Sequence, residues 1–265
     1  MRLDTELVRR GLARSREQAA ELVEAGRVQV SGKAAVKAAT QVLAVDPIVV
    51  RPSESGPDYV SRGAHKLLGA LDAFQPLGLV VDGRRCLDAG ASTGGFTDVL
   101  LRCGAAHVHC VDVGYGQLAW SLRTDDRVTV LDRTNVRTLE PATVQPPADL
   151  VVTDLSFISV RLVLGALVRC ATGDADFLPM VKPQFEVGRD MLGPGGVVRD
   201  PEQRADAVRD VARAAYDEHG LGVRGVVASP LPGPAGNVEY FLWLRRDAPE
   251  LDPAHLAAAI AAGPQ

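Results

Sequence analysis

The stretch Asp88-Ala-Gly-Ala-Ser-Thr-Gly-Gly-Phe96 decides the fold, because it places a glycine-rich turn between two regular segments. The preceding residues, 84–89, form the short apolar run of a buried strand, and residues 97–102 have the pattern of a helix. Strand, glycine turn and helix open a doubly wound α/β domain, and ligands bind at such turns. Glycine lets the backbone approach a ligand closely, although a tight turn without a ligand is the alternative.

The turn does not match the dinucleotide fingerprint Gly-x-Gly-x-x-Gly, since Ser92 stands where the second glycine belongs. The pattern Asp-x-Gly-x-x-x-Gly instead resembles the cofactor loop of S-adenosylmethionine-dependent methyltransferases. This resemblance implies that the loop borders the amino-acid end of the cofactor. The residues that it assigns to the cofactor are Asp88, Gly90, Ala91, Ser92, Thr93, Gly94 and Phe96.

Strand-like and helix-like segments alternate after residue 84, which is typical of a parallel sheet covered by helices on both faces. Further strands are expected at residues 107–113, 128–132, 149–154, 176–182, 223–229 and 238–244, and helices at residues 116–123 and 201–219. With the cofactor loop, this pattern predicts an α/β fold of the Rossmann-like class I methyltransferase type over residues 65–248. Its doubly wound sheet is mostly parallel, with an antiparallel last strand.

Two residues after later strands complete the predicted cofactor site. Asp112 ends the second strand, about twenty residues after the glycine turn, where an acidic side chain suits a pair of ribose hydroxyls. In methyltransferases the corresponding acid binds the adenosine ribose, whereas a helix N-cap is the alternative role. Asn135 follows the third strand and is placed to reach the adenine.

The first 51 residues form a separate module of two short helices followed by small strands. This module carries nine Lys/Arg and six Asp/Glu, a net charge of +3, against 20 and 27 in the remainder, a net charge of −7. The asymmetry makes the module the candidate for anionic partners. Residues 52–64, rich in turn formers, are predicted as a linker, and residues 249–265 as an alanine-rich C-terminal tail.

The module resembles an S4 RNA-binding domain. The matching patterns are Arg2-Leu-Asp, Leu7-Val-x-Arg-Gly11, Ser15-Arg-x-x-Ala-x-x-Leu22 and Gly26-x-Val-x-Val-x-Gly32. The resemblance implies that the RNA phosphate contacts include Arg2, Arg10, Arg14, Arg16 and Arg27. Such contacts supply affinity and register rather than sequence reading. Arginines that merely pair with Glu17, Glu21 or Glu24 are the alternative.

Four charged residues border one crevice of the predicted fold: Lys66, Asp154, Lys182 and Glu239. A lysine that closes an apolar strand, as Lys182 does, is costly to desolvate unless it is paired or functional, and Asp154 is its natural partner. Together the four match the Lys-Asp-Lys-Glu tetrad of RNA ribose 2′-O-methyltransferases. Asp154-Leu-Ser-Phe157 lacks the prolines of amino-methylating enzymes, which argues for another acceptor. Phe157 stacks on a base or belongs to the core.

The whole chain resembles the TlyA (haemolysin A) family of ribosomal-RNA 2′-O-methyltransferases. The matching stretches are residues 61–67, 88–96, 111–118, 154–159, 181–186 and 236–240. The resemblance implies methyl transfer from S-adenosylmethionine to cytidine 2′-hydroxyls in ribosomal subunits, in the large subunit (23S) or in both (16S and 23S). It also implies an effect on susceptibility to capreomycin-type antibiotics.

A mechanism follows from the tetrad as a hypothesis. The ribose hydroxyl must be held in line with the methyl–sulfur bond, and its proton must be managed. We expect Lys182 to accept or steer that proton, with burial and the charge of Lys66 favouring its neutral form. Asp154 would orient Lys182, and Glu239 would hold Lys66 or the ribose.

Composition narrows the remaining possibilities. The chain has 265 residues, is 46% hydrophobic and has a mean hydropathy of +0.05, which fits a globular protein with a sizeable core. No apolar stretch reaches the length of a membrane span and no signal-peptide core is present, so we expect a cytoplasmic protein. Four cysteines without a Cys-x-x-Cys pair indicate reduced thiols, and five scattered histidines argue against a metal site.

Three other functions remain as alternatives. A membrane-active haemolysin would need an amphipathic or spanning segment, and none is evident. A non-catalytic ribosome-binding assembly factor would keep the N-terminal module but has no need of the tetrad. A pseudouridine synthase often carries an S4 module, yet its catalytic domain would not supply a glycine turn between strand and helix.

Overall fold

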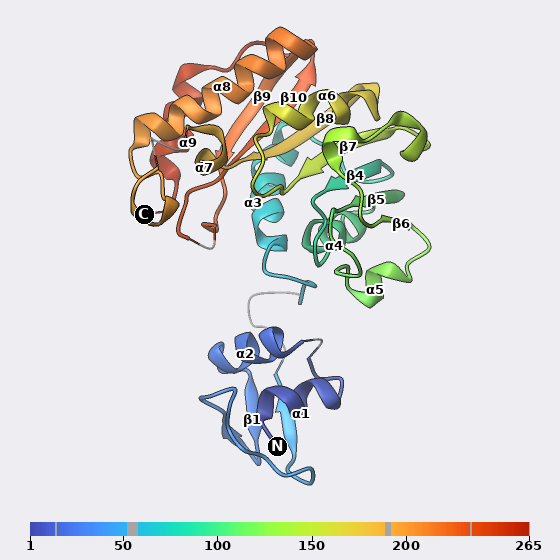
Figure 1. Ribbon diagram of the computed structural model, residues 1–265, viewed down its shortest axis with the longest axis vertical. Helices are drawn as coiled ribbons and strands as arrows, with labels where there is room; N and C mark the ends of the chain where they lie inside the picture. The colour runs from blue at the N-terminus through green and yellow to red at the C-terminus, as the bar shows by residue number, and fades with distance from the viewer. Residues whose placement is uncertain (14, 52–57, 189–191, 234, 265) are drawn as a thin grey trace. The chain divides into compact units, whose positions relative to one another are not determined.

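The computed structural model describes residues 1–13, 15–51, 58–188, 192–233 and 235–264. The chain divides into two compact units, Met1–Asp58 and Tyr59–Gln265 (Figure 1). The sequence suggested boundaries at residues 51 and 65, on either side of a linker that lies partly outside the described ranges. Those boundaries remain predictions.

The small unit packs two helices against a three-stranded antiparallel sheet. Its elements are α1 (Leu3–Arg9), α2 (Arg16–Glu24), β1 (Val28–Val30), β2 (Lys33–Ala34) and β3 (Ile48–Val50), with the strands in the order β2-β1-β3. The Ser15 side chain accepts a hydrogen bond from the Gln18 amide at 3.1 Å, so Ser15 is the N-cap of α2. Leu3, Leu7 and Val28 are fully buried in its core.

The large unit is built on a seven-stranded sheet with the order β6-β5-β4-β7-β8-β10-β9. Its strands are β4 (Arg85–Ala89), β5 (His107–Val111), β6 (Val128–Leu131), β7 (Ala148–Thr153), β8 (Ala171–Val181), β9 (Leu221–Ala228) and β10 (Tyr240–Arg246). The strands β6, β5, β4, β7 and β8 run parallel, and β10 runs antiparallel to both of its neighbours. The predicted fold class is therefore confirmed.

Helices cover both faces of this sheet. One face carries α3 (Ala64–Phe74), α4 (Gly95–Arg102) and α5 (Trp120–Arg123); the other carries α6 (Arg161–Arg169), α8 (Pro201–His219) and α9 (Pro253–Ala262). The short helix α7 (Pro183–Glu186) follows β8, and 3₁₀ turns lie at Gln75–Leu77, Val136–Thr138, Pro141–Thr143 and Pro194–Gly196. Side chains of β4 alternate, with Cys86 in one core and Leu87 in the other, as strand geometry requires.

Two expected segments differ from the structure. The helix expected at residues 116–123 begins only at Trp120, because the preceding backbone is drawn into a loop. Gly116 has φ +68°, and its amide donates to the Asp132 carboxylate at 3.2 Å instead of entering a helix. The segment treated as a C-terminal tail contains α9, which packs on α8 and β9.

The topology creates a crevice at the carboxyl ends of the central strands β4, β5 and β7. From β4 the chain crosses to β5 on one side, and it later returns to β7 on the other side. Ligands bind at such a switch point, outside the carboxyl ends of the strands. Gly90 follows β4 there, and Asp154 follows β7.

The cysteines are free thiols, and Cys86, Cys110 and Cys170 are buried. Burial raises the pKa of Cys86 to about 12, so this thiol stays protonated near neutral pH. Within the described part of the chain, no helix is long and apolar enough to cross a membrane.

A buried histidine on β5 predicts a pH dependence of stability. Burial, with a smaller contribution from His107, lowers the pKa of His109 from 6.5 to about 4. The unfolded chain takes up a proton below about pH 6.5, whereas the folded chain does so only near pH 4. Stability from this group is therefore complete above pH 6.5 and falls, by about 2–3 kcal/mol, as pH drops to 4.

Denaturant unfolding of the wild type and of His109→Leu between pH 4 and 7.5 measures this contribution. Burial raises the pKa of Asp88 to about 7, so that carboxyl changes stability in the opposite direction over the same range. The difference between the two proteins isolates His109. A difference in unfolding free energy that does not change with pH would contradict the prediction.

Candidate active site

The glycine turn after β4 is shaped by close backbone approach. Gly90 has φ +90°, and a Cβ placed there would lie 2.6 Å from the carbonyl oxygen of Asp154 on the neighbouring strand's exit. Gly94, with φ +98°, is the N-cap of α4, in a left-handed conformation that only glycine adopts readily. Both positions therefore favour glycine: φ is positive at each, and an added Cβ would meet the Asp154 carbonyl at Gly90 and the Leu122 side chain at Gly94.

Two cavities meet at this turn. A cavity of about 530 Å³ is lined by residues that include Asp112, Asn135 and Phe157. A smaller one, of about 170 Å³, is lined by residues that include Ser61, Ala91, Thr93 and Phe96. Gly90, Ser92 and Asp154 border both cavities. Of the residues predicted to bind the cofactor, only Asp88 and Gly94 line neither cavity.

Asp88 lies behind the turn and is fully buried. Its Oδ2 accepts a hydrogen bond from Thr97 Oγ1 at 2.7 Å, and its Oδ1 has no hydrogen-bond partner among the described residues. Because burial disfavours the charged form, the pKa of this carboxyl rises to about 7. Its position fits support of the turn from below rather than contact with the contents of the cavities.

Asp112 lies at the larger cavity with its carboxylate fixed by backbone amides. Oδ2 accepts from the Ser92 amide at 2.8 Å, and Oδ1 accepts from the Gly114 amide at 2.7 Å. Each carboxylate oxygen can accept further hydrogen bonds, which suits two adjacent ribose hydroxyls. Asp112 is not a helix N-cap, because α5 begins eight residues later and is preceded by Ala119.

The two cavities fit S-adenosylmethionine. The larger one offers the Asp112 carboxylate and the Asn135 amide for a nucleoside, and the Asn135 Oδ1 also accepts from the Arg137 amide at 3.0 Å. The smaller one lies against the Gly90–Phe96 turn, where a side chain at Gly90 would fill the space beside Asp154. An elongated ligand with a nucleoside end and an amino-acid end matches this shape.

The four charged residues predicted to act together do meet beside these cavities. Lys182 Nζ lies 2.6 Å from Asp154 Oδ1, and Lys66 Nζ lies 2.6 Å from Glu239 Oε2. The second oxygen of Glu239, Oε1, lies 3.9 Å from Lys182 Nζ, so Glu239 connects the two pairs. Two ammonium groups and two carboxylates balance in charge, as burial requires.

Burial differs among these four side chains. Glu239 is 1% exposed, whereas the Asp154 side chain is 25% exposed and faces both cavities. Glu239 Oε1 has no hydrogen-bond partner among the described residues, and a Cβ at Gly233 would lie 2.6 Å from it. The exposed carboxylate lies toward the ligand space, and the buried one holds the lysines from behind.

Sequence reasoning missed two residues that shape this site. Ser156 Oγ accepts a hydrogen bond from Lys182 Nζ at 3.2 Å, and Glu186 binds the loop that follows β7. Ser156 carried a weak signal, its place in a loop after a central strand. Phe157 is not a core aromatic, because it is 91% exposed.

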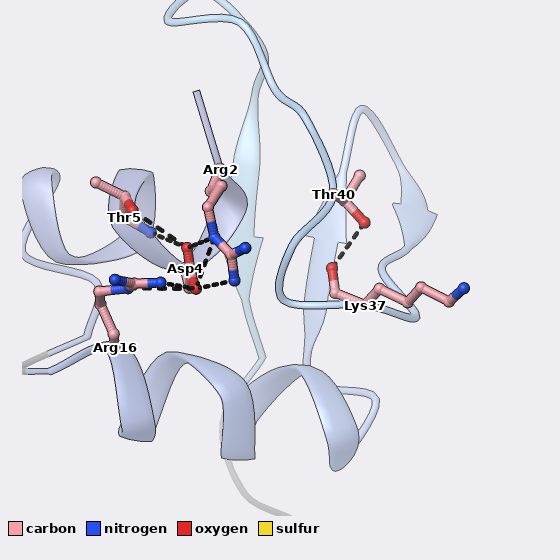
Figure 2. Close-up of polar contacts among 6 residues, drawn as sticks. All are labelled: Arg2, Asp4, Thr5, Arg16, Lys37 and Thr40. Atoms are coloured by element: carbon pink, nitrogen blue, oxygen red, sulfur yellow. Dashed lines mark hydrogen bonds and ion pairs between the residues drawn. The ribbon is translucent and has the colours of Figure 1, made fainter.

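The arginines predicted for RNA binding fall into two groups in the small unit. Arg2 and Arg16 both pair with the buried Asp4, at 2.8 and 3.1 Å, and their side chains remain 46% and 61% exposed (Figure 2). The Arg2 guanidinium holds the pKa of the Asp4 carboxyl well below its usual range. Thr5 donates to the same carboxylate through its amide at 2.7 Å. Two exposed cations are thus held by one carboxylate.

The other arginines are used differently. Arg10 pairs with Glu6 at 2.7 Å and donates to the carbonyl oxygen of Asp46 at 2.7 Å. Arg27 makes a two-point contact with Asp58, at 2.7 and 2.8 Å. Both are mostly buried, so their guanidinium groups serve the module itself. Arg14 lies outside the described residues.

Residues 59–246 match the FtsJ-like methyltransferase family, and residues 1–48 match the S4 domain. Fold, cavities and charged residues agree with this class. The protein is an S-adenosylmethionine-dependent methyltransferase with an S4 module.

Individual relatives narrow the class. The chain is 64% identical over 244 residues to the 16S/23S rRNA (cytidine-2′-O)-methyltransferase TlyA of Mycobacterium tuberculosis, covering 92% of this chain and 89% of that one. It is 31% identical to the 23S rRNA (cytidine-2′-O)-methyltransferase TlyA of Campylobacter jejuni, over 86% and 93% of the two chains. A solved "Putative hemolysin" from Streptococcus thermophilus is 36% identical with a TM-score of 0.77, over 98% and 94%. The chain belongs to the TlyA family.

Replacing Gly90 by alanine tests the cofactor turn. The new Cβ would meet the Asp154 carbonyl, so we expect the dissociation constant for S-adenosylmethionine to rise by at least about tenfold. Gly83→Ala is the matched control, because Gly83 also has positive φ but nothing lies within 4 Å of the added Cβ. Titration calorimetry on both variants gives the comparison. Equal binding by both would mean that the cofactor lies elsewhere.

Proposed function

We propose that this enzyme transfers the methyl group of S-adenosylmethionine to the 2′-hydroxyl of cytidine in ribosomal RNA. The observation that carries the proposal is the pair of lysine–carboxylate contacts, Lys182 with Asp154 and Lys66 with Glu239. Asp154 joins these contacts to the ligand space, because it lines both cavities. The names of the M. tuberculosis and C. jejuni relatives supply the cytidine and the RNA. The substrate is the ribosomal subunit in the cytoplasm, with 23S RNA and also 16S RNA as acceptors.

The reaction forms an oxygen–methyl bond and breaks the sulfur–methyl bond, and the hydroxyl proton must leave. The cofactor, as a sulfonium, supplies an already reactive methyl group. The protein therefore has to align the hydroxyl and stabilise the charge that develops on its oxygen. Lys182 is held by Asp154 and Ser156, so its ammonium is fixed in direction. We assign it the steering of the hydroxyl and Asp154, a quarter exposed, the passage of the proton to solvent.

Phe157 supports an RNA acceptor with an unstacked base. Its ring is 91% exposed beside the larger cavity and lies 5.3 Å from the ring of Phe185. An exposed aromatic face suits stacking on a base that has left its helix. We propose that Phe157 holds the cytosine while its ribose lies at Lys182.

The S4 module supports a large RNA, rather than a free nucleotide, as the substrate. Arg2 and Arg16 both pair with the buried Asp4 carboxylate, and their guanidinium groups remain exposed. Two exposed guanidinium groups held close together suit neighbouring phosphates. By this proposal they position the subunit and the tetrad performs the reaction. Loss of the methylation would lower susceptibility to capreomycin-type antibiotics.

The decisive experiment is transfer of labelled methyl from S-adenosylmethionine to purified 30S and 50S subunits from an unmodified strain. The 2′-O-methyl group protects the adjacent linkage from alkaline cleavage, which locates it. Incorporation at a cytidine supports the proposal. Cofactor binding without incorporation favours the non-catalytic assembly factor, and leakage of lipid vesicles would favour a haemolysin.

Lys182→Ala should lower the methylation rate by at least about 100-fold, because it removes the group that faces the reacting oxygen. Binding of S-adenosylmethionine should stay within about threefold of wild type, since Lys182 lines neither cavity. Single-turnover assays at saturating subunit separate the two effects. Lys33→Ala, an exposed lysine of the small unit, is the control and should keep the wild-type rate. An active Lys182→Ala enzyme refutes the assignment.

The double variant Arg2→Ala/Arg16→Ala should bind subunits about tenfold or more weakly near 0.1 M salt. The salt dependence of binding should flatten by about one to two units of slope, because two phosphate contacts are lost. Filter binding over a range of salt concentrations measures both. Arg9→Ala is the control, an exposed arginine on the same unit that pairs with Glu6. If the control weakens binding equally, the Asp4-centred pair has no special role.

A further inference from the structure

The two loops that carry the reactive side chains are joined at several points. Residues 154–160 follow β7, and residues 182–186 follow β8, the neighbouring parallel strand. Lys182 contacts Asp154 and Ser156 at the start of the loops. Farther along, the rings of Phe157 and Phe185 lie 5.3 Å apart. A third connection lies at the far end, away from the reacting atoms.

That third connection is the side chain of Glu186, which is 1% exposed. Its Oε2 accepts from Ser159 Oγ at 2.5 Å, and its Oε1 accepts from the Val160 amide at 2.7 Å. Arg161 Nε donates to Oε2 at 3.2 Å, and Arg161 Nη2 donates to the Glu186 carbonyl at 3.1 Å. One carboxylate thus accepts from three consecutive residues at the end of the 154–160 loop and the start of α6.

These contacts also cap a helix. Val160 is the N-cap residue of α6, and its own amide is one of the helix-start donors that have no acceptor within the helix. The next three amides bond to Ser159 and to the Val160 carbonyl. Glu186 supplies the acceptor from another element, 26 residues away, and brings negative charge to the helix N-terminus. The end of the 154–160 loop is therefore fixed by Glu186, which belongs to the same segment as Lys182, residues 182–186.

The middle of the loop contains a residue in a strained backbone conformation. Phe157 has φ +63°, a conformation that costs a bulky residue about 1–3 kcal/mol and persists only where its surroundings impose it. Its ring is almost fully exposed, so core packing does not hold it in place. The ring of Phe185 lies beside it, and Leu155 and Ile158 pack against the core. The polar side-chain contacts from the segment after β8 lie at the two ends of the loop, at Lys182 and at Glu186.

We infer that Glu186 is a positioning residue for methyl transfer: by binding Ser159, Val160 and Arg161, it fixes the Asp154–Ser159 loop against the segment that carries Lys182. It touches neither the reacting atoms nor the two cavities. Its effect reaches the reaction through the placement of Asp154, Ser156 and Phe157. The predicted effect on activity rests on the proposed function. The predicted effect on structure does not, because it is measured as the hydrogen exchange of the loop amides.

The test compares Glu186→Ala, Glu186→Gln and Ser159→Ala with the wild type. We expect Glu186→Ala to lower kcat for subunit methylation by about 10- to 100-fold, since a misplacement near 1 Å costs that much. The KM for S-adenosylmethionine should change by less than about threefold. Glu186→Gln should restore most of the rate, because its amide can still accept from Val160 and donate to Ser159. Ser159→Ala, which removes one contact, should fall between them.

Asp176→Ala provides the matched control for lost stability. Asp176 is a buried carboxylate on β8, the strand that precedes the segment with Lys182 and Glu186; it is 1% exposed and accepts from Trp243 Nε1 at 2.7 Å. It lies six residues before Lys182, about 20 Å along the strand. Thermal melts identify the temperature at which both variants are equally folded. If Glu186→Ala then loses no more activity than Asp176→Ala, Glu186 is only structural and the inference is overturned.

Hydrogen exchange measured by mass spectrometry separates the inference from the proposed function. Glu186→Ala should speed exchange in peptides covering residues 155–161, whereas Asp176→Ala should not. If the wild type methylates no subunit, the proposed function fails, but these peptides still decide whether Glu186 holds the loop. Unchanged exchange there in Glu186→Ala and Ser159→Ala would overturn the inference directly.

Discussion

The close approach of Gly90 to the backbone of Asp154 governs the rest of the site. The Asp154 amide donates to the Ala89 carbonyl at 3.1 Å, and any Cβ at Gly90 would lie 2.6 Å from the Asp154 carbonyl. The residues that follow β4 and β7 are therefore held next to each other at the carboxyl end of the sheet. As a result, the cofactor turn and the carboxylate that pairs with Lys182 share a wall, and neither can move without the other.

The charged residues add a second constraint, which is electrostatic. An unpaired lysine or carboxylate at this depth would cost several kcal/mol to desolvate, so each of the four requires its partner. The partners come from helix α3, the exits of β7 and β8, and the segment before β10. Because Glu239 contacts both lysines, an error in any one of these elements would leave a buried charge unmatched. The four charged residues thus favour the native fold over alternatives in which one of the buried charges lacks its partner.

Much of this arrangement could be predicted from local sequence. The glycine turn, the alternation of strands and helices, and the mostly parallel sheet with an antiparallel last strand follow from patterns within a few residues and from family resemblance. The contacts of Glu186 and Asp4 could not be predicted, because each joins positions that approach only in the folded chain. The shortened α5 was missed for a related reason: the distant Asp132 carboxylate captures the Gly116 amide and keeps it out of the helix.

Buried carboxylates act in two ways in this chain, and the difference lies in whether a cation is near. Asp4 has Arg2 and Arg16 beside it, its pKa is lowered, and it fixes two exposed cations at the surface of the small unit. The Asp88 carboxyl has Thr97 as its only hydrogen-bond partner in the described part of the chain, and burial raises its pKa to about 7. A charged carboxylate can hold cations for an anionic partner, whereas one that is readily protonated supports a turn without adding a full charge beside the cofactor. Asp154 also has a cation beside it, since its Oδ1 lies 2.6 Å from Lys182 Nζ, and its side chain is 25% exposed. The proposed reaction needs a carboxylate that reaches both the lysine and the ligand space.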